Sequence, residues 1–221
     1  MKKIHLLPIL LSVFLGVQQL YSQDSLSVFK PKPVTAEEFI GDKRQFFQIV
    51  VNKLFVEKKK IGLLSISSYA ADYNDKLSNN EFQNTTLIYH PLFKGIGINS
   101  GTSFTSLEGM KNFVGLQFIY QSKSISLIYL PSYYFTKTQK ISNFALIEYK
   151  PKISENWSLY ARLQLHYNYD VESGNHFRSY VYSRLGMTYK YFSFGLGHNY
   201  DCYGADKNTK NNYGVFLALT L

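Results

Sequence analysis

Two segments with alternating side chains contain the densest group of residues whose side chains could bind a ligand or take part in catalysis. Trp157 to Asp170 places polar and apolar residues on opposite faces with a period of two, and Phe177 to Tyr189 repeats this pattern. The polar faces carry the candidate lumen-facing residues Arg162, Gln164, His166, Arg178, Tyr182 and Arg184. Guanidinium, imidazole, amide and phenol groups together could line a cationic lumen or fill the polar interior of a small barrel. We expect the packed interior.

The histidines do not form a recognisable metal motif. His5, His90, His166, His176 and His198 show neither H-x-x-H nor H-E-x-x-H spacing. The sequence also lacks a G-x-S-x-G elbow and a glycine-rich phosphate loop. We therefore expect no metal, no cofactor and no catalytic residues.

One stretch supports an enzymatic alternative. Lipid A deacylases of the outer membrane resemble small barrels with a His-x-Ser pair near the end of the penultimate strand. The corresponding stretch here is His198-Asn199-Tyr200-Asp201, so Tyr200 stands at the serine position. A phenol is a poor nucleophile for acyl transfer, which needs a hydroxyl activated by a neighbouring imidazole. We predict that the protein is not an enzyme, and an enzyme that modifies envelope lipid remains the alternative.

The elements that position these residues are β-strands. Alternation predicts strands at about 61–73, 83–91, 95–105, 112–121, 124–135, 141–150, 157–170, 177–189, 191–201 and 213–221. Many are as long as the roughly nine to eleven residues that a tilted strand needs to cross a bilayer. A soluble sandwich, the alternative, has strands of about five or six residues. We predict an all-β, antiparallel transmembrane β-barrel over 61–221 with about ten strands, eight or twelve being the alternatives.

The links between the strands predict an even strand number. Short links near 91–94, 122–123 and Lys190 alternate with longer polar links at 74–82, 106–111, 136–140, 170–175 and 202–211. Outer-membrane barrels have short periplasmic turns and longer outer loops, so both chain ends should lie on the short-link side.

The segment upstream of the predicted barrel is harder to assign. Phe46 to Val56 is apolar enough for a strand but would make the strand number odd, so it belongs either to an N-terminal appendage over 23–60 or to an extra pair of strands that makes twelve. Thr35-Ala36-Glu37-Glu38 has capping-box spacing, which predicts a short helix beneath the barrel or in its lumen.

The N-terminus and the composition indicate export to an outer membrane. Residues 1–22 combine Lys2 and Lys3 with an apolar stretch and a small residue, Ser22, which is typical of a cleavable signal peptide. Charged residues make up 18% and aromatic residues 17%, which suits a protein surface that is partly apolar and partly in contact with water. The net charge of +9 then favours anionic lipid headgroups over nucleic acid as the partner. Outer-membrane lipid and, during insertion, the barrel-assembly machinery are the expected partners.

Four C-terminal motifs carry a family resemblance. They are Glu148-Tyr149-Lys150-Pro151, the segment from Asn156 to Gln164, Phe194-Gly195-Leu196-Gly197 and Asn212-Tyr213-Gly214-Val215-Phe216. Together they resemble small outer-membrane β-barrel proteins of Bacteroidota-type bacteria, a group without an assigned activity. The resemblance implies the fold and the location and brings no site residues. We expect a structural or passive-transport role as a narrow pore. The alternatives are a lipid-modifying enzyme and a barrel that binds an external partner through its outer loops.

Overall fold

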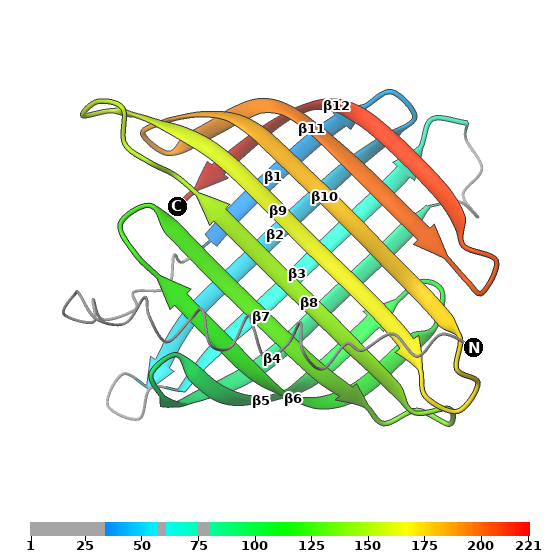
Figure 1. The fold of residues 1–221 in the computed structure, drawn as a ribbon. Helices are drawn as coiled ribbons and strands as arrows, with labels where there is room; N and C mark the ends of the chain where they lie inside the picture. Colours follow the sequence, from blue (N-terminus) through cyan, green and yellow to red (C-terminus); the bar gives the residue numbers. More distant parts are fainter. Residues whose placement is uncertain (1–33, 57–60, 75–79) are drawn as a thin grey trace, which may run out of the picture. The chain divides into compact units, whose positions relative to one another are not determined.

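A computed structural model of the protein describes residues 34–56, 61–74 and 80–221. This part of the chain forms twelve antiparallel strands in which each pairs with the next along the chain, and the first pairs with the last to close a barrel (Figure 1). The strands are β1 (Val34–Gly41), β2 (Arg44–Val56), β3 (Ile61–Asp72), β4 (Glu81–Phe93), β5 (Ile96–Thr105), β6 (Gly109–Gln121), β7 (Ile125–Tyr134), β8 (Lys140–Tyr149), β9 (Trp157–Asp170), β10 (His176–Tyr189), β11 (Phe192–Tyr203) and β12 (Asn208–Thr220). Closure leaves no unpaired sheet edge.

The all-β antiparallel barrel is confirmed, and the preferred count of ten is corrected to the alternative of twelve. The two additional strands are β1 and β2, so residues 34–56 belong to the barrel and not to an appendage. The helix predicted from Thr35 is wrong. The capping-box spacing is a local signal, whereas β1 gains ladder hydrogen bonds to both β2 and β12 and buries Glu37 and Phe39. The predicted signal peptide at 1–22 and the stretch 23–33 lie outside the described residues.

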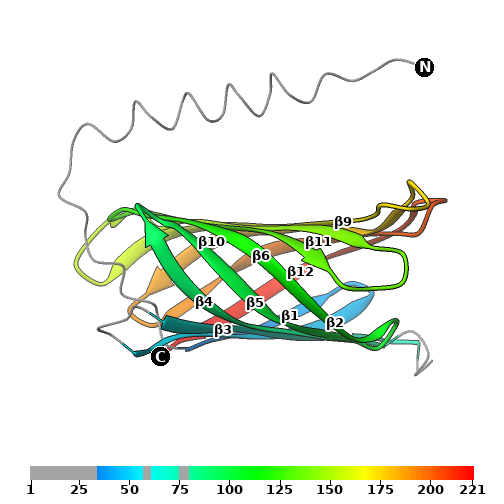
Figure 2. The same cartoon turned by 90° about the horizontal axis from the view of Figure 1, so that it is seen from below.

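Both ends of the barrel-forming chain lie at the same end of the barrel. Val34 and Leu221 exchange backbone hydrogen bonds there, beside the links β4–β5, β6–β7, β8–β9 and β10–β11. We call this the terminal end, and we call the opposite end, with the links β1–β2, β5–β6, β7–β8, β9–β10 and β11–β12, the loop end (Figure 2). The predicted even strand number is confirmed. The contrast in link length is weaker than expected, because the β8–β9 link at 150–156 is longer than the β5–β6 link at 106–108.

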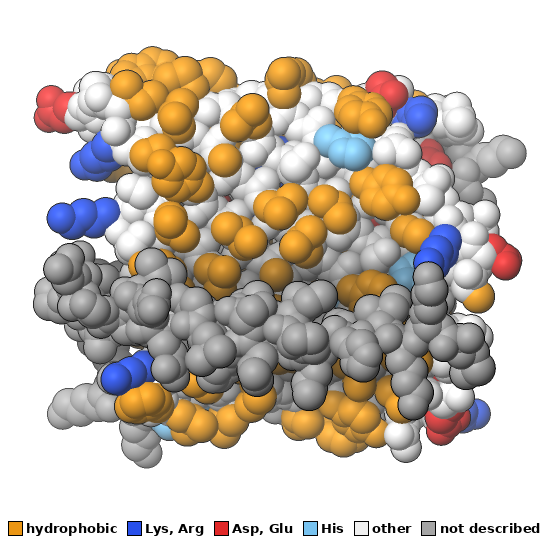
Figure 3. Space-filling model, in the orientation of Figure 1, with side chains coloured by type: hydrophobic (Ala, Val, Ile, Leu, Met, Phe, Trp, Pro, Cys, Tyr) orange, Lys and Arg blue, Asp and Glu red, His pale blue; other side chains and the backbone are white. Residues whose placement is uncertain are grey.

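The outer surface of the barrel carries many exposed apolar side chains (Figure 3). Leu185 on β10 and Leu196 on β11 are 70% and 69% exposed, and the two residues are paired in register. Water-soluble monomers rarely expose apolar surface over a wide area. In the part of the chain that the structure describes, no helix is both long and apolar enough to cross a membrane.

Side chains fill the inside of the barrel in two clusters. An aromatic cluster comprises Phe39, Phe46, Ala70, Tyr160, Tyr180, Tyr182, Phe216 and Ala218. An aliphatic cluster comprises Leu64, Leu87, Tyr89, Phe113, Ile128, Leu130 and Tyr134. The residues of the aromatic cluster come from strands on both sides of the β1–β12 closure. Those of the aliphatic cluster come from β3, β4, β6 and β7, so each cluster packs against a different part of the wall.

Candidate functional site

The six candidate lumen residues lie on the inner side of the wall formed by β9 and β10. Arg162, Gln164, Tyr182 and Arg184 are 2–5% exposed. Their neighbours along β10, such as Val181 and Leu185, are exposed on the outer side. The side chains therefore alternate between the two faces, as strand geometry requires.

Glu37 joins two of these residues across the inside of the barrel. Its carboxylate lies 2.8 Å from Nη2 of Arg162 and 2.9 Å from Nη2 of Arg184. β1, which carries Glu37, is separated from β9 by three strands and from β10 by two, so these ion pairs run through the interior. All three side chains are at most 4% exposed. We call this group the Glu37 triad.

The surroundings of Arg184 fix the position of its guanidinium group. Arg184 Nη1 donates to Oδ1 of Asn199 at 2.8 Å and to the carbonyl of Ser183 at 2.9 Å. The guanidinium carbon lies 4.3 Å from the centre of the Phe39 ring, which is within cation–π distance. A fully buried arginine needs such partners because removing an unpaired charge from water is very costly.

A second group of ion pairs lies inside the barrel at the loop end, and its centre is Glu81 at the start of β4. Glu81 accepts from Nη2 of Arg44 at 2.8 Å and from the Tyr203 hydroxyl at 2.8 Å. It also lies 3.0 Å from Nη2 of Arg178 and 3.4 Å from Nζ of Lys210. Asp72 and Asp201 extend the group through Arg44 and Arg178. We call Arg44, Asp72, Glu81, Arg178, Asp201, Tyr203 and Lys210 the loop-end layer.

The loop-end layer links opposite walls of the barrel. Its members come from β2, β3, β4, β10, β11 and β12. Tyr182 attaches to the layer because its hydroxyl donates to Oδ1 of Asp201 at 2.8 Å. Below the layer, the Phe46 and Tyr182 rings meet edge to face at 5.2 Å. A cavity of about 10 Å³ lies beside these residues, and Arg44, Phe46 and Tyr182 around it are at most 5% exposed.

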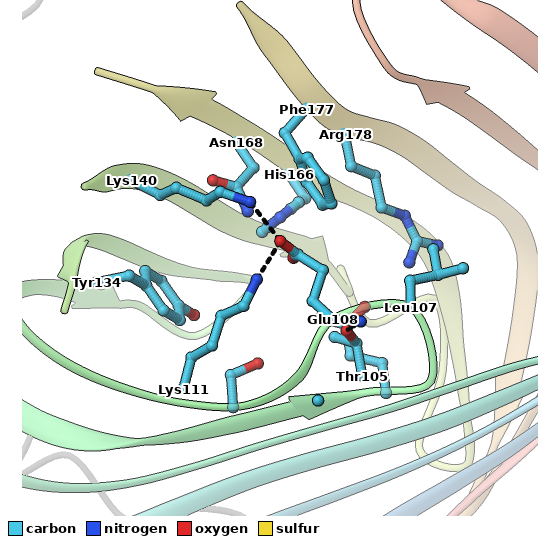
Figure 4. Close-up of a pocket in the computed structure, with 13 residues that line it drawn as sticks. Thr105, Leu107, Glu108, Lys111, Tyr134, Lys140, His166, Asn168, Phe177 and Arg178 are labelled. Carbon is cyan, nitrogen blue, oxygen red and sulfur yellow. Dashed lines mark hydrogen bonds and ion pairs between the residues drawn. The ribbon is translucent and has the colours of Figure 1, made fainter. Parts of the chain in front are cut away.

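Another cavity, of about 30 Å³, lies at the loop end beside Glu108, Lys111 and Lys140 (Figure 4). Both lysines form ion pairs with Glu108. His166 and Arg178 also line this cavity, and the His166 ring stacks on Tyr180 with the ring centres 5.0 Å apart. Gln164, in contrast, lies away from the cavity lining and donates to the Tyr180 hydroxyl at 3.3 Å.

Sequence reasoning found three of the cations, Arg162, Arg178 and Arg184, and missed their anionic partners. It also missed the cations Arg44, Lys111, Lys140 and Lys210. The capping-box pattern suggested a different role for Glu37. Glu81 lies at the start of a strand and Glu108 lies in a turn, where side chains no longer alternate between two faces. The usable signal was the need for counter-charges: buried arginines on β9 and β10 require acidic residues elsewhere on the inner wall.

His198 lies on the outer wall and not with the lumen residues. Its Nε2 is 2.9 Å from Oδ1 of Asn211, and its ring stacks on Tyr213 with the centres 4.2 Å apart. Tyr200, the residue at the serine position, has its ring centre 6.4 Å away. Among the described residues, no group of His, Cys, Asp and Glu side chains is arranged to hold a metal ion.

Comparison with solved structures finds similarity to barrels at low sequence identity. The KdgM porin in complex with disordered oligogalacturonate is 13% identical, with a TM-score of 0.48 over 85% of this chain and 98% of that one. The NanC porin is 12% identical, with a TM-score of 0.49 over the same shares. LpxR from Salmonella typhimurium is 6% identical, with a TM-score of 0.45 over 85% of this chain and 99% of that one. No protein-family model and no curated protein matches the chain.

Proposed function

We propose that the protein is an integral outer-membrane β-barrel whose narrow polar lumen passes small ions passively and is closed at rest by the loop-end layer. The observation that carries this proposal is the combination of an apolar outer wall with ion pairs that join non-adjacent strands across the interior. This arrangement suits a wall in contact with outer-membrane lipid and a lumen in contact with water. Assembly by the barrel-assembly machinery remains a prediction.

The ion pairs support a passage that opens by rearrangement. A buried ion pair adds little net stability compared with apolar packing, so interior charges need another reason to be present. In a lumen, paired charges keep the route polar, and water can solvate them when they separate. The small cavities of about 30 Å³ and 10 Å³ imply that the resting passage is narrow.

Conductance across planar lipid bilayers tests the proposal. We expect the wild-type barrel to give small, brief currents, and Glu81→Gln to increase the open fraction because it weakens the contacts to Arg44, Arg178 and Lys210. Glu38→Gln is the matched control, since Glu38 bonds to Gln45 in an exposed position. The proposal is overturned if neither wild type nor Glu81→Gln conducts current while heat-modifiable gel migration shows that both barrels have folded.

One observation favours the lipid-modifying enzyme as a second candidate. Ser183 is the register partner of His198 on the outer wall, and His198 contacts Asn211. If Nε2 donates to Asn211, Nδ1 is left to accept a proton from a neighbouring hydroxyl, as nucleophilic catalysis requires. Release of acyl chains from envelope lipid by wild type but not by Ser183→Ala would support this candidate. Equal release by both proteins, or none, would exclude a role for Ser183.

A further inference from the structure

The loop-end cavity brings two ammonium groups to one carboxylate. Lys111 on β6 and Lys140 on β8 both contact Glu108, which belongs to the turn between β5 and β6 (Figure 4). The three side chains are only 10–14% exposed. Ammonium groups this far removed from water need a counter-ion. Glu108 supplies that ion from a short turn and not from a strand.

The other neighbours of the two lysines do not replace Glu108. Nζ of Lys140 lies 3.6 Å from the centre of the Phe177 ring and Nζ of Lys111 lies 5.4 Å from it, so both cations lie close to the same aromatic ring. Asp170 is the register partner of Lys140, but its Oδ1 accepts from the backbone N–H of Ser173 at 3.0 Å. Glu108 is therefore the carboxylate that both ammonium groups contact.

The cavity beside this group also offers polar atoms without partners. Arg178 and Asn168 line it. Within the described part of the chain, Nε of Arg178 and Oδ1 of Asn168 are buried without a hydrogen-bond partner, although Arg178 uses Nη2 for Glu81 and Asp201. Buried polar groups are nearly always satisfied by protein, water or ligand. A polar group bound in the cavity would therefore lie beside residues that carry an unused donor and an unused acceptor.

We propose that this cavity binds the carboxylate of a small organic acid, and that Glu108 occupies the position of that carboxylate in the unliganded protein. Displacement of the β5–β6 turn would free Lys111 and Lys140 for the solute, whose apolar part would contact Phe177. This inference rests on the proposed function and deepens it, because it names small carboxylates as the class of solute that the passage admits.

Acetate is the probe, and saturation-transfer NMR on the protein refolded in detergent micelles is the measurement. We expect Glu108→Gln to bind acetate about tenfold more tightly than wild type, because the competing carboxylate is gone. Lys140→Gln in the Glu108→Gln background should remove this gain, and Lys140→Arg should keep it. Glu38→Gln and Lys43→Gln are matched controls, since Glu38 and Lys43 lie away from the cavity lining.

Acetate affinity in Glu108→Gln that equals wild type and Glu38→Gln would overturn the inference. Gel migration without boiling shows whether each variant has folded, and Lys140→Arg covers the case in which Lys140→Gln does not fold. The binding measurement does not depend on conductance. A sealed barrel that binds acetate as expected would refute the passage and keep the site. A conducting barrel without the acetate difference would refute the site and keep the passage.

Discussion

The wall formed by β9, β10 and β11 and the middle of β3 and β4 distribute their side chains in opposite ways. On the first wall, Arg162, Arg184 and Asn199 face inward, and Leu185 and Leu196 face outward. On the second wall, leucines and Tyr89 pack inside the barrel. The outer side of β3 and β4 instead carries Ser65, Ser67, Asn84 and Thr86 in its middle, with exposed Tyr69, Phe82 and Ile88 on either side of them.

The outward polar residues on β3 and β4 satisfy one another. The Ser65 and Thr86 hydroxyls are 2.8 Å apart, and Nδ2 of Asn84 donates to the Ser67 hydroxyl at 2.7 Å. The inner wall of β9 to β11, in contrast, depends on Glu37 from a distant strand. The difference teaches that alternation alone shows two faces but does not show which face looks into the lumen. It also means that the two walls should respond differently to substitution.

The largest effect is expected from Glu37→Gln. This change leaves Arg162 and Arg184 buried without their counter-charge, and breaking a buried ion pair costs about 3–5 kcal/mol of unfolding free energy. Urea unfolding of the barrel in lipid vesicles measures the loss. Glu38→Gln, at the next residue on the outer side, should cost less than about 1 kcal/mol. Equal losses in the two variants would show that the Glu37 triad is not a structural ion-pair group.

Leu185→Arg should have the next largest effect. If the outer wall contacts lipid, an arginine at this position costs about 2–4 kcal/mol near the bilayer centre and less toward an interface. Leu92→Arg is the control, because Leu92 is 60% exposed and lies near the end of β4. This variant should lose about 0–1 kcal/mol of unfolding free energy. The same vesicle unfolding experiment applies. An unfolding free energy of Leu185→Arg equal to that of wild type would show that this face contacts water.

Tyr89→Phe tests the inner side of the opposite wall. The Tyr89 hydroxyl donates to Oδ1 of Asn52 at 2.9 Å, so its removal leaves one buried acceptor without this bond while the ring packing stays. We expect a loss of about 1–2 kcal/mol, well below that of Glu37→Gln. A loss as large as that of Glu37→Gln would mean that the aliphatic side depends on polar contacts as strongly as the charged side does.

The smallest effect is expected from the double variant Ser65→Ala with Thr86→Val. Replacing both partners of a hydrogen bond by apolar groups of similar shape is nearly neutral, but the part-buried Asn84 also loses its contacts with Thr86 at 3.1 Å and Ser65 at 3.4 Å. The unfolding free energy should therefore change by about 1 kcal/mol or less. Asn84 keeps its bond to Ser67 in this variant. A loss above about 2 kcal/mol would show that this outward polar group stabilises the barrel in its own right.

The same contrast explains what the sequence could predict. Trp157–Asp170 matches β9 at both ends because apolar residues face out and polar residues face in along its whole length. The capping-box spacing predicts a helix at β1, and no alternation in its eight residues opposes that prediction, because its two buried residues, Glu37 and Phe39, differ in polarity. The ion pairs of Glu37 and Glu81 with β9, β10 and β12 depend on closure between β1 and β12, which no local pattern contains.

Collision of a nitroxide label with oxygen and with a water-soluble nickel chelate tests the central claim, that the outer wall faces lipid. The label is placed at Leu185→Cys in a Cys202→Ser background, because Cys202 is a free, buried cysteine. Asp206→Cys, in the exposed β11–β12 link, is the reference for water. With the barrel in vesicles, we expect oxygen to relax the label at 185 strongly and nickel weakly, with the reverse at 206. Nickel accessibility at 185 equal to that at 206 would contradict the membrane-spanning barrel.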